Sequence, residues 1–176
     1  KKIPPPFFLK KISGSGNQNY KMIENKNDLN KLKFLDKNKW VIEEPLNKNL
    51  DEFTCTIVRL NKLRKIIIFK RKLHKLGHTM FVEKYENPII EKKLLNLAEN
   101  LDLNGSLNIQ FKIQNEKIKI FDINPRLSST VKMRDVIGFK DCLWWINDKL
   151  NIKNKQIIKI KKFKYIVKHF QEKVIR

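Results

Sequence analysis

The chain has 176 residues and a mass of 21.1 kDa, which suits one domain, or one domain with a small second lobe. Lys and Arg number 39 against 18 Asp and Glu, so the net charge is +21 and the first partners to consider carry phosphate or other anionic groups. Two cysteines exclude a disulfide scaffold and suit a reducing, cytoplasmic compartment, and no apolar run reaches the about 20 residues that cross a bilayer. Because Lys is spread along the whole chain and is abundant together with Asn and Ile, we favour compositional bias over a dedicated nucleic-acid surface.

The chain starts with Lys1 rather than Met, and we expect it to be part of a longer protein. Short apolar runs bounded by turn residues predict strands, which in chain order span 7–10, 20–23, 40–42, 53–60, 64–71, 79–84, 107–113, 118–123 and 165–170. Turn residues predict hairpins around Asn61–Lys62 and Asn115–Glu116.

Apolar residues at helical spacing predict helices at 28–36, 88–101 and 141–150. Asn27 is placed to cap the first helix, and Asn87 the second, with Pro88 at its first position and Gly105 beyond its end. The core-facing stripe of the second helix is expected to consist of Ile90, Leu94, Leu97 and Leu101. Strands in runs with helices between them favour an α+β fold with an antiparallel sheet.

Lys10 lies just before a loop that contains Gly14, Ser15 and Gly16. Glycine lets the backbone approach an anion closely, and exposed N–H groups in such a turn bind phosphate, to which Lys10 would add a positive charge. The loop leads to a strand and lacks the Gly-Lys-Ser/Thr of a Walker A motif. On these residues alone, a flexible hairpin turn is the favoured alternative.

Asp122 and Asn124 lie two residues apart at the end of a predicted strand, so their side chains leave the same face. Both offer the oxygen atoms that Mg²⁺ prefers. Pro125 stops the strand, and Arg126 emerges beside the pair as a group that binds phosphate. The alternative is a polar strand end with a capping Asn.

The preceding strand offers a further oxygen ligand, Gln110. One hairpin register places Gln110 opposite Asp122 and Phe111 opposite Phe121. The neighbouring register gives an equally apolar face, with Ile113 opposite Ile118, but separates Gln110 from Asp122. The pattern alone leaves both registers open.

Glu43, Glu44, Pro45 and Leu46 follow a short strand, and Glu52 comes soon after them. The backbone of such a hinge between lobes pairs well with the edge of a base, and a carboxylate nearby accepts hydrogen bonds from sugar hydroxyls. A solvated acidic loop is the favoured alternative on these residues alone.

Taken in order, these segments resemble the ATP-grasp superfamily, most closely the branch akin to the large subunit of carbamoyl phosphate synthase. The resemblance covers nearly the whole chain and is carried by residues 10–19, 41–46, 52–54, 76–79 (Leu-Gly-His-Thr), 108–111 and 122–126. The last two segments are the strongest match. Asp122 stands where the family usually has Glu, Thr56 where it often has Asp, and the phosphate loop lacks the family's Pro, Arg and final Gly.

The resemblance implies an ATP-grasp fold, with two lobes built on antiparallel sheets and an ATP-binding cleft between them. The small lobe with the phosphate loop would span 1–42, and the large lobe with the metal site and the C-terminal strand would span 43–176. The N-terminal domain of complete ATP-grasp enzymes is not recognised in the sequence.

The resemblance also assigns roles to single residues. Gln110, Asp122 and Asn124 would bind Mg²⁺ or Mn²⁺, while Lys10 and Arg126 would neutralise the transferred phosphate. Further nucleotide contacts fall to Gly14, Ser15, Gly16, Glu43, Glu44, Leu46 and Glu52. Because metal ligands must converge, the resemblance favours the register that pairs Gln110 with Asp122. His78 and Arg134 are candidate substrate-side groups, with surface or packing roles as the favoured alternative.

The implied activity is that of an ATP- and Mg²⁺-dependent carboxylate–amine ligase acting through an acyl phosphate, with this chain as its nucleotide-binding portion. We expect ATP, a carboxylate and an amine as partners, leave a homodimer open, and expect no membrane partner. The alternatives are a basic nucleic-acid-binding protein, whose affinity would fall steeply with salt, and an ATP-grasp fragment that folds without turnover.

Overall fold

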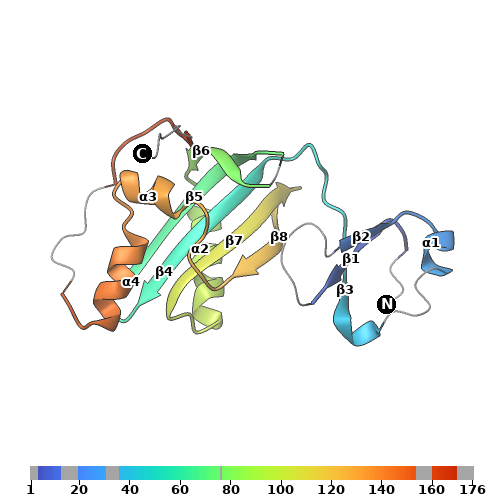
Figure 1. Cartoon of the computed structure of the whole chain (residues 1–176), viewed down its shortest axis with the longest axis horizontal. Helices are drawn as coiled ribbons and strands as arrows, with labels where there is room; N and C mark the ends of the chain where they lie inside the picture. Colours follow the sequence, from blue (N-terminus) through green and yellow to red (C-terminus); the bar gives the residue numbers. More distant parts are fainter. Residues whose placement is uncertain (1–3, 13–19, 31–35, 76, 154–159, 170–176) are drawn as a thin grey trace, which may run out of the picture. The chain divides into compact units, whose positions relative to one another are not determined.

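A computed structural model describes residues 4–12, 20–30, 36–75, 77–153 and 160–169 (Figure 1). The chain divides into two compact units, Lys1–Asn49 and Leu50–Arg176. The break thus falls after residue 49, whereas the resemblance places it after residue 42, and the roles assigned to the two lobes remain predictions. Within the described ranges, no helix combines the length and the apolar character needed to cross a membrane.

The first unit is built on a small antiparallel sheet with the order β2-β1-β3. Its strands are β1 (Phe7–Lys11), β2 (Tyr20–Ile23) and β3 (Trp40–Glu43), as the sequence predicts. Three buried residues, Phe7, Leu9 and Ile23, form its core, and Trp40 packs against them. This core is small because the strands are short and present only alternate residues to it.

The helix predicted at 28–36 begins earlier than expected, since α1 spans Lys26–Asn30. Asn25, and not Asn27, is the cap: its Oδ1 accepts hydrogen bonds from the backbone N–H groups of Asn27 and Asp28. Asn27 lies within the first turn, where its own N–H needs this partner. Residues 31–35 lie outside the described part. A short 3-10 helix, η2 (Lys37–Lys39), precedes β3.

The second unit contains a six-stranded sheet in the order β8-β7-β4-β5-β6-β9. Its strands are β4 (Glu52–Leu60), β5 (Leu63–Leu73), β6 (Thr79–Tyr85), β7 (Gly105–Gln114), β8 (Lys117–Asn124) and β9 (Tyr165–Val167). Every pair of neighbouring strands is antiparallel, which confirms the α+β prediction. The terminal strand is shorter than the predicted 165–170.

Helix α2 (Pro88–Asn100) covers one face of this sheet. The predicted cap is confirmed, because Oδ1 of Asn87 accepts hydrogen bonds from the N–H groups of Ile89 and Ile90. The buried stripe consists of Ile90, Leu94 and Ala98. Leu101 was expected in this stripe, but the helix ends at Asn100, and Leu101 is its exposed C-cap.

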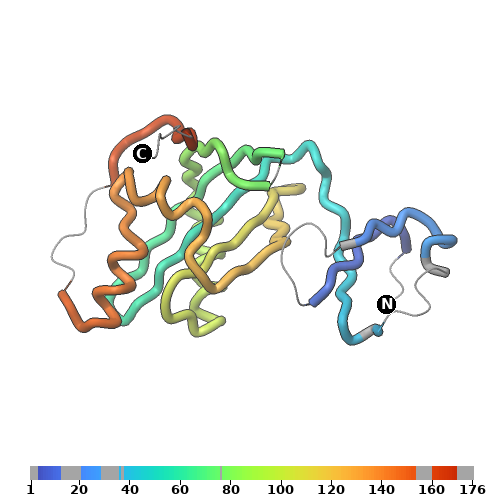
Figure 2. Tube along the Cα trace, viewed as in Figure 1, coloured from blue at the N-terminus to red at the C-terminus, as the bar shows by residue number. Residues whose placement is uncertain are grey.

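Helices α3 (Val131–Val136) and α4 (Asp141–Lys149) pack on the opposite face of the sheet, where Met133, Ile137 and Trp144 join its buried side chains. Figures 1 and 2 show both helices, and the segment that leads to them from β8, on the near side of the sheet. The sequence predicts α4 but not α3, because six residues are too few to establish a helical period.

The β7–β8 hairpin realises both registers that the sequence left open, each in its own half. Near the turn, Ile113 pairs with Ile118, and farther along Gln110 pairs with Asp122. The predicted turn at Asn115–Glu116 has positive φ at both residues, 50° and 59°, as a type I′ hairpin turn requires.

A bulge in β8 reconciles the two registers. Phe111 pairs with Ile120 and not with Phe121, so the expected pairing of the two phenylalanines is wrong. Phe121 is the extra residue of the bulge. Because of it, the side chains of Ile120 and Asp122 lie on opposite faces of the sheet. Without it, strict alternation would place Asp122 on the side of the sheet that α2 covers.

Candidate functional site

A polar half of one sheet face carries the candidate site. On the face covered by α3 and α4, the part of the sheet that includes Val58, Phe69 and Val82 is apolar. The part of the same face toward β8 is polar. The polar side chains come from four neighbouring strands and are Glu52, Thr54, Thr56, Arg71, Asn108, Gln110, Asp122 and Asn124. Strand alternation places them together, because each lies on the same side as Val58 or Phe69.

The structure brings the three predicted metal ligands to one face. Gln110 on β7 is the direct cross-strand partner of Asp122 on β8, and Asn124 is two residues farther along β8. Nδ2 of Asn124 donates a hydrogen bond to Oδ2 of Asp122 at 2.5 Å. This contact turns the amide nitrogen of Asn124 toward Asp122 and leaves its oxygen for another ligand.

Arg71, which sequence reasoning missed, connects three strands of the polar half. Its Nε donates to Oε1 of Glu52 at 2.9 Å, and Nη2 contacts the same oxygen. Nη2 also donates to Oε1 of Gln110 at 2.6 Å. Arg71 therefore connects the acid predicted to bind ribose with the amide predicted to bind metal.

A signal for Arg71 was present in the sequence. The predicted hairpin turn at Asn61–Lys62 fixes the register of β4 against β5, and this register places Glu52 opposite Arg71. An acid and a base directly opposite each other on two strands form a favourable cross-strand pair. Extending the predicted hairpin to its far end would have found the pair.

Three residues of the polar half are buried. Thr54, Thr56 and Asn108 are almost fully buried, and Oγ1 of Thr54 donates to Oδ1 of Asn108 at 2.9 Å. A buried polar group is costly unless it is hydrogen-bonded, so this contact lets polar side chains occupy the interior of the sheet face.

Arg126 follows Asn124 in a tight turn, with its N–H bonded to the carbonyl of Asn124 at 2.8 Å. Its guanidinium donates to the carbonyl of Leu127 at 3.0 Å, and the residue is exposed. The structure thus places Arg126 at the end of β8, next in the chain to the predicted metal ligands. Its role toward phosphate remains a prediction.

Arg134 is fully buried, which favours the packing role over a substrate role. Its Nε and Nη2 donate to Oδ2 of Asp141, and Nη1 donates to the hydroxyls of Ser128 and Thr130. Burial lowers the pKa of Arg134 from its usual value, and Asp141 opposes that shift. The network fixes α3 against the start of α4.

His78 lies in the β5–β6 loop and is exposed. Its ring stacks parallel on that of His74, with 5.9 Å between the ring centres. The backbone N–H of His74 donates to the carbonyl of His78 at 2.8 Å, which closes the loop. A substrate role for His78 remains a prediction.

In the first unit, two predicted nucleotide contacts meet. Nζ of Lys10 on β1 lies 3.2 Å from Oε1 of Glu43 on β3. Glu44 is exposed and Leu46 half-buried in the segment after β3. The predicted phosphate-loop residues Gly14, Ser15 and Gly16 lie outside the described residues.

The donor set of the polar half fits Mg²⁺. Asp122 supplies a carboxylate and Asn124 an amide oxygen, both of which are hard ligands. No cluster of three His, Cys, Asp or Glu suited to a metal occurs in the described part of the chain. A metal held here would therefore take other oxygens as well, and Mg²⁺ commonly completes its shell with waters and substrate phosphates.

Comparison with known protein families gives a match over most of the chain. A family described as ATP-grasp in the biosynthetic pathway with Ter operon matches residues 36–172. The matched range includes Glu43 and every residue of the polar half.

Solved structures with the same fold include a synthetase and two carboxylases. N5-carboxyaminoimidazole synthetase from Staphylococcus aureus, complexed with ADP, is 18% identical, with a TM-score of 0.63 over 81% of this chain and 41% of its own. A biotin carboxylase complex with βγ-ATP from Campylobacter jejuni is 14% identical, with a TM-score of 0.69 over 92% of this chain and 40% of its own. The biotin carboxylase domain dimer of Hydrogenobacter thermophilus 2-oxoglutarate carboxylase was solved with MgADP, ADP and bicarbonate. It is 12% identical, with a TM-score of 0.69 over 93% of this chain and 40% of its own.

These likenesses confirm the fold predicted from the sequence. At such identities they speak for the fold alone, and the chain spans about two-fifths of the length of these proteins.

Proposed function

We propose that this chain, which belongs to the family of ATP-grasp proteins in the biosynthetic pathway with the Ter operon, binds ATP with Mg²⁺ and activates a carboxylate. The observation that carries the proposal is the pairing of Gln110 with Asp122, beside Asn124, on the polar half of the sheet face. The ADP, ATP and MgADP complexes of proteins with this fold support the choice of nucleotide and metal.

The residues of the proposed site would offset the negative charge of ATP. ATP brings about four negative charges to one place, and an incoming carboxylate is repelled by them. Arg126 would offset part of this charge from the end of β8. Gln110, Asp122 and Asn124 would hold Mg²⁺, which supplies positive charge to the phosphates when bound.

The proposed reaction has two steps. A carboxylate oxygen attacks the γ-phosphorus, the bond from that phosphorus to the bridging oxygen of ADP breaks, and an acyl phosphate forms. The nitrogen of an amine then attacks the acyl carbon, phosphate leaves with the electron pair of the C–O bond, and the amine loses a proton. Arg126 would stabilise the charge that moves between these groups.

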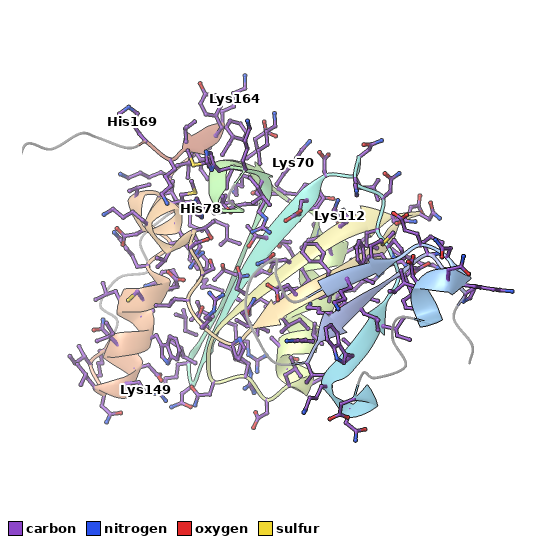
Figure 3. All side chains as sticks on the ribbon, turned by 45° about the vertical axis from the view of Figure 1, so that its right-hand side comes forward. Lys70, His78, Lys112, Lys149, Lys164 and His169 are labelled. Atoms are coloured by element: carbon purple, nitrogen blue, oxygen red, sulfur yellow. The ribbon has the colours of Figure 1, made fainter. Side chains whose placement is uncertain are left out.

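The net charge of +21 raises nucleic acid as a competing partner. In the second unit the basic residues come from many segments, and Figure 3 shows the labelled Lys70 on β5, Lys112 on β7, Lys149 on α4 and Lys164 just before β9. A charge dispersed in this way gives weak, salt-sensitive attraction to any polyanion.

A thermal-unfolding screen tests the proposal. Mg·ATP and Mg·ADP should raise the unfolding temperature of the wild-type chain at 150 mM salt, because a ligand that binds only the folded state stabilises it. Stabilisation by a mixed-sequence oligonucleotide, and not by Mg·nucleotide, would contradict the proposal. Phosphate release with a panel of carboxylates then distinguishes a ligase from a fragment that binds ATP without turnover.

A further inference from the structure

Gln110 carries an amide whose oxygen is already engaged. Nη2 of Arg71 donates to its Oε1 at 2.6 Å. A guanidinium has donors only, so the amide must turn its oxygen toward Arg71 and its nitrogen away. In the described part of the chain Nε2 has no hydrogen-bond partner, and the side chain is half-buried opposite Asp122. The free end of Gln110 is therefore a donor.

Arg71 is itself fixed in position. Its side chain is only 8% exposed and forms an ion pair with Glu52 through two nitrogens. A third nitrogen, Nη1, lies 3.4 Å from Oγ1 of Thr79. These contacts hold the guanidinium beside Gln110 and set the orientation of its amide.

We propose that Arg71 is a positioning residue that orients Gln110 to donate a hydrogen bond from Nε2 to a phosphate oxygen of the nucleotide. This inference rests on the proposed nucleotide site and changes one role within it. Gln110 becomes a phosphate-binding residue, and the metal is left to Asp122 and Asn124.

Charge argues for this reassignment. Oε1 of Gln110 already accepts from a cation, and a second cation on the same oxygen would be repelled by the guanidinium. A phosphate oxygen at Nε2 is attracted instead, because a donor polarised by a nearby cation binds an anion more strongly. The sequence alone could not make this distinction, because it shows an amide at position 110 and not its orientation.

The two roles of Gln110 predict opposite results for Gln110→Glu. A carboxylate is a better Mg²⁺ ligand than an amide, so a metal-binding role predicts a lower Mg²⁺ concentration at half-maximal ADP affinity. A phosphate-binding role predicts weaker ADP binding at saturating Mg²⁺, because the donor is replaced by an anion. Asn96→Asp is the matched control, since Asn96 is exposed on α2, on the other side of the sheet.

The experiment is a calorimetric titration of ADP across a series of Mg²⁺ concentrations, with folding checked by circular dichroism. We expect Gln110→Glu and Gln110→Ala to weaken ADP binding at saturating Mg²⁺ by about tenfold or more, the loss of one hydrogen bond to a charged group, without a lower Mg²⁺ midpoint. Asn96→Asp should leave the ADP affinity within about twofold of wild type. A lower Mg²⁺ midpoint in Gln110→Glu, or an unchanged ADP affinity in Gln110→Ala, would overturn the assignment.

Variants of Arg71 test the positioning role separately. Arg71→Met should weaken ADP binding at saturating Mg²⁺ and leave the Mg²⁺ midpoint unchanged, and Arg71→Lys, which keeps a donor, should recover part of the loss. A raised Mg²⁺ midpoint with unchanged ADP affinity in Arg71→Met would contradict the inference. No binding of ADP by the wild-type chain at any Mg²⁺ concentration would overturn the proposed function itself.

Discussion

Arg134 and Asp141 form an ion pair that the second unit encloses almost completely, with side-chain exposures of 0% and 1%. Ser128 and Thr130 accept the remaining hydrogen bonds of the guanidinium, while Oδ1 of Asp141 has no partner among the described residues. Removing one charge from such a pair leaves the other buried and uncompensated. The pair therefore acts on stability, and its loss should be costly.

We predict that Asp141→Ala lowers the free energy of unfolding by about 3–5 kcal/mol, and that Arg134→Met with Asp141→Leu recovers most of the loss. Glu99→Ala, which breaks the exposed pair with Arg64, should cost less than about 1 kcal/mol. Urea titrations measure all three. Equal effects of Asp141→Ala and Glu99→Ala would contradict this account of the buried pair.

Burial also controls the reactivity of the two cysteines. Burial raises the pKa of the Cys55 thiol well above its usual value, and the charge of Glu91 adds to the shift. The folded chain therefore keeps Cys55 protonated at pH values where the unfolded thiol, with a pKa of about 8.5, has ionised. It follows that the contribution of this thiol to stability is complete below that pH and is lost as the pH rises above it.

In the native protein at pH 8, iodoacetamide should modify Cys142, which is partly exposed, and spare Cys55 until urea unfolds the chain. Peptide mass spectrometry locates the adducts, and Cys142→Ser should abolish labelling under native conditions. Modification of Cys55 in the folded protein at the rate of Cys142 would show that the thiol is accessible.

At the scale of elements, Gly105 sets how closely the start of β7 approaches α4. A Cβ atom built on it would lie 2.6 Å from Cζ2 of Trp145, and its φ of +133° disfavours other residues. Gly77, in the β5–β6 loop, also has a positive φ of +85° but has nothing within 4 Å of a built Cβ. The two glycines thus separate the cost of backbone strain from the cost of a steric clash.

Gly105→Ala should lower the free energy of unfolding by about 1–3 kcal/mol more than Gly77→Ala, the usual cost of overpacking. The measurement is a pair of urea unfolding curves with equal m-values. Equal losses in the two variants would mean that α4 moves aside without cost.

The sequence predicts most strands and both long helices, because alternation, helical spacing and the Asn87–Pro88 start are local signals. It misses α3, whose six residues provide no period, and it places the first helix two residues late by choosing Asn27 over Asn25 as the cap. The bulge at Phe121 is invisible to alternation, because each half of the hairpin follows its own regular register. The candidate site depends on this bulge, so the resemblance to a family predicted its geometry better than the pattern of residues did.

At the scale of the whole molecule, the charge of +21 and the polar half of the sheet face suggest different partners. Dispersed lysines attract any polyanion, and that attraction weakens as salt is added. The proposed metal site of Asp122 and Asn124 would make nucleotide binding depend on a divalent cation. Dependence on Mg²⁺ is therefore the property that separates the two.

The most direct test is a calorimetric titration of ADP, with Mg²⁺ or with EDTA, into the wild-type chain and the variant Asp122→Ala with Asn124→Ala. Removal of the same two residue types from α4, Asp148→Ala with Asn147→Ala, is the control. We predict that Mg²⁺ strengthens ADP binding by about tenfold or more in the wild type and the control, and that the site variant loses this gain. Equal strengthening by Mg²⁺ in the site variant would contradict the assignment of the metal site.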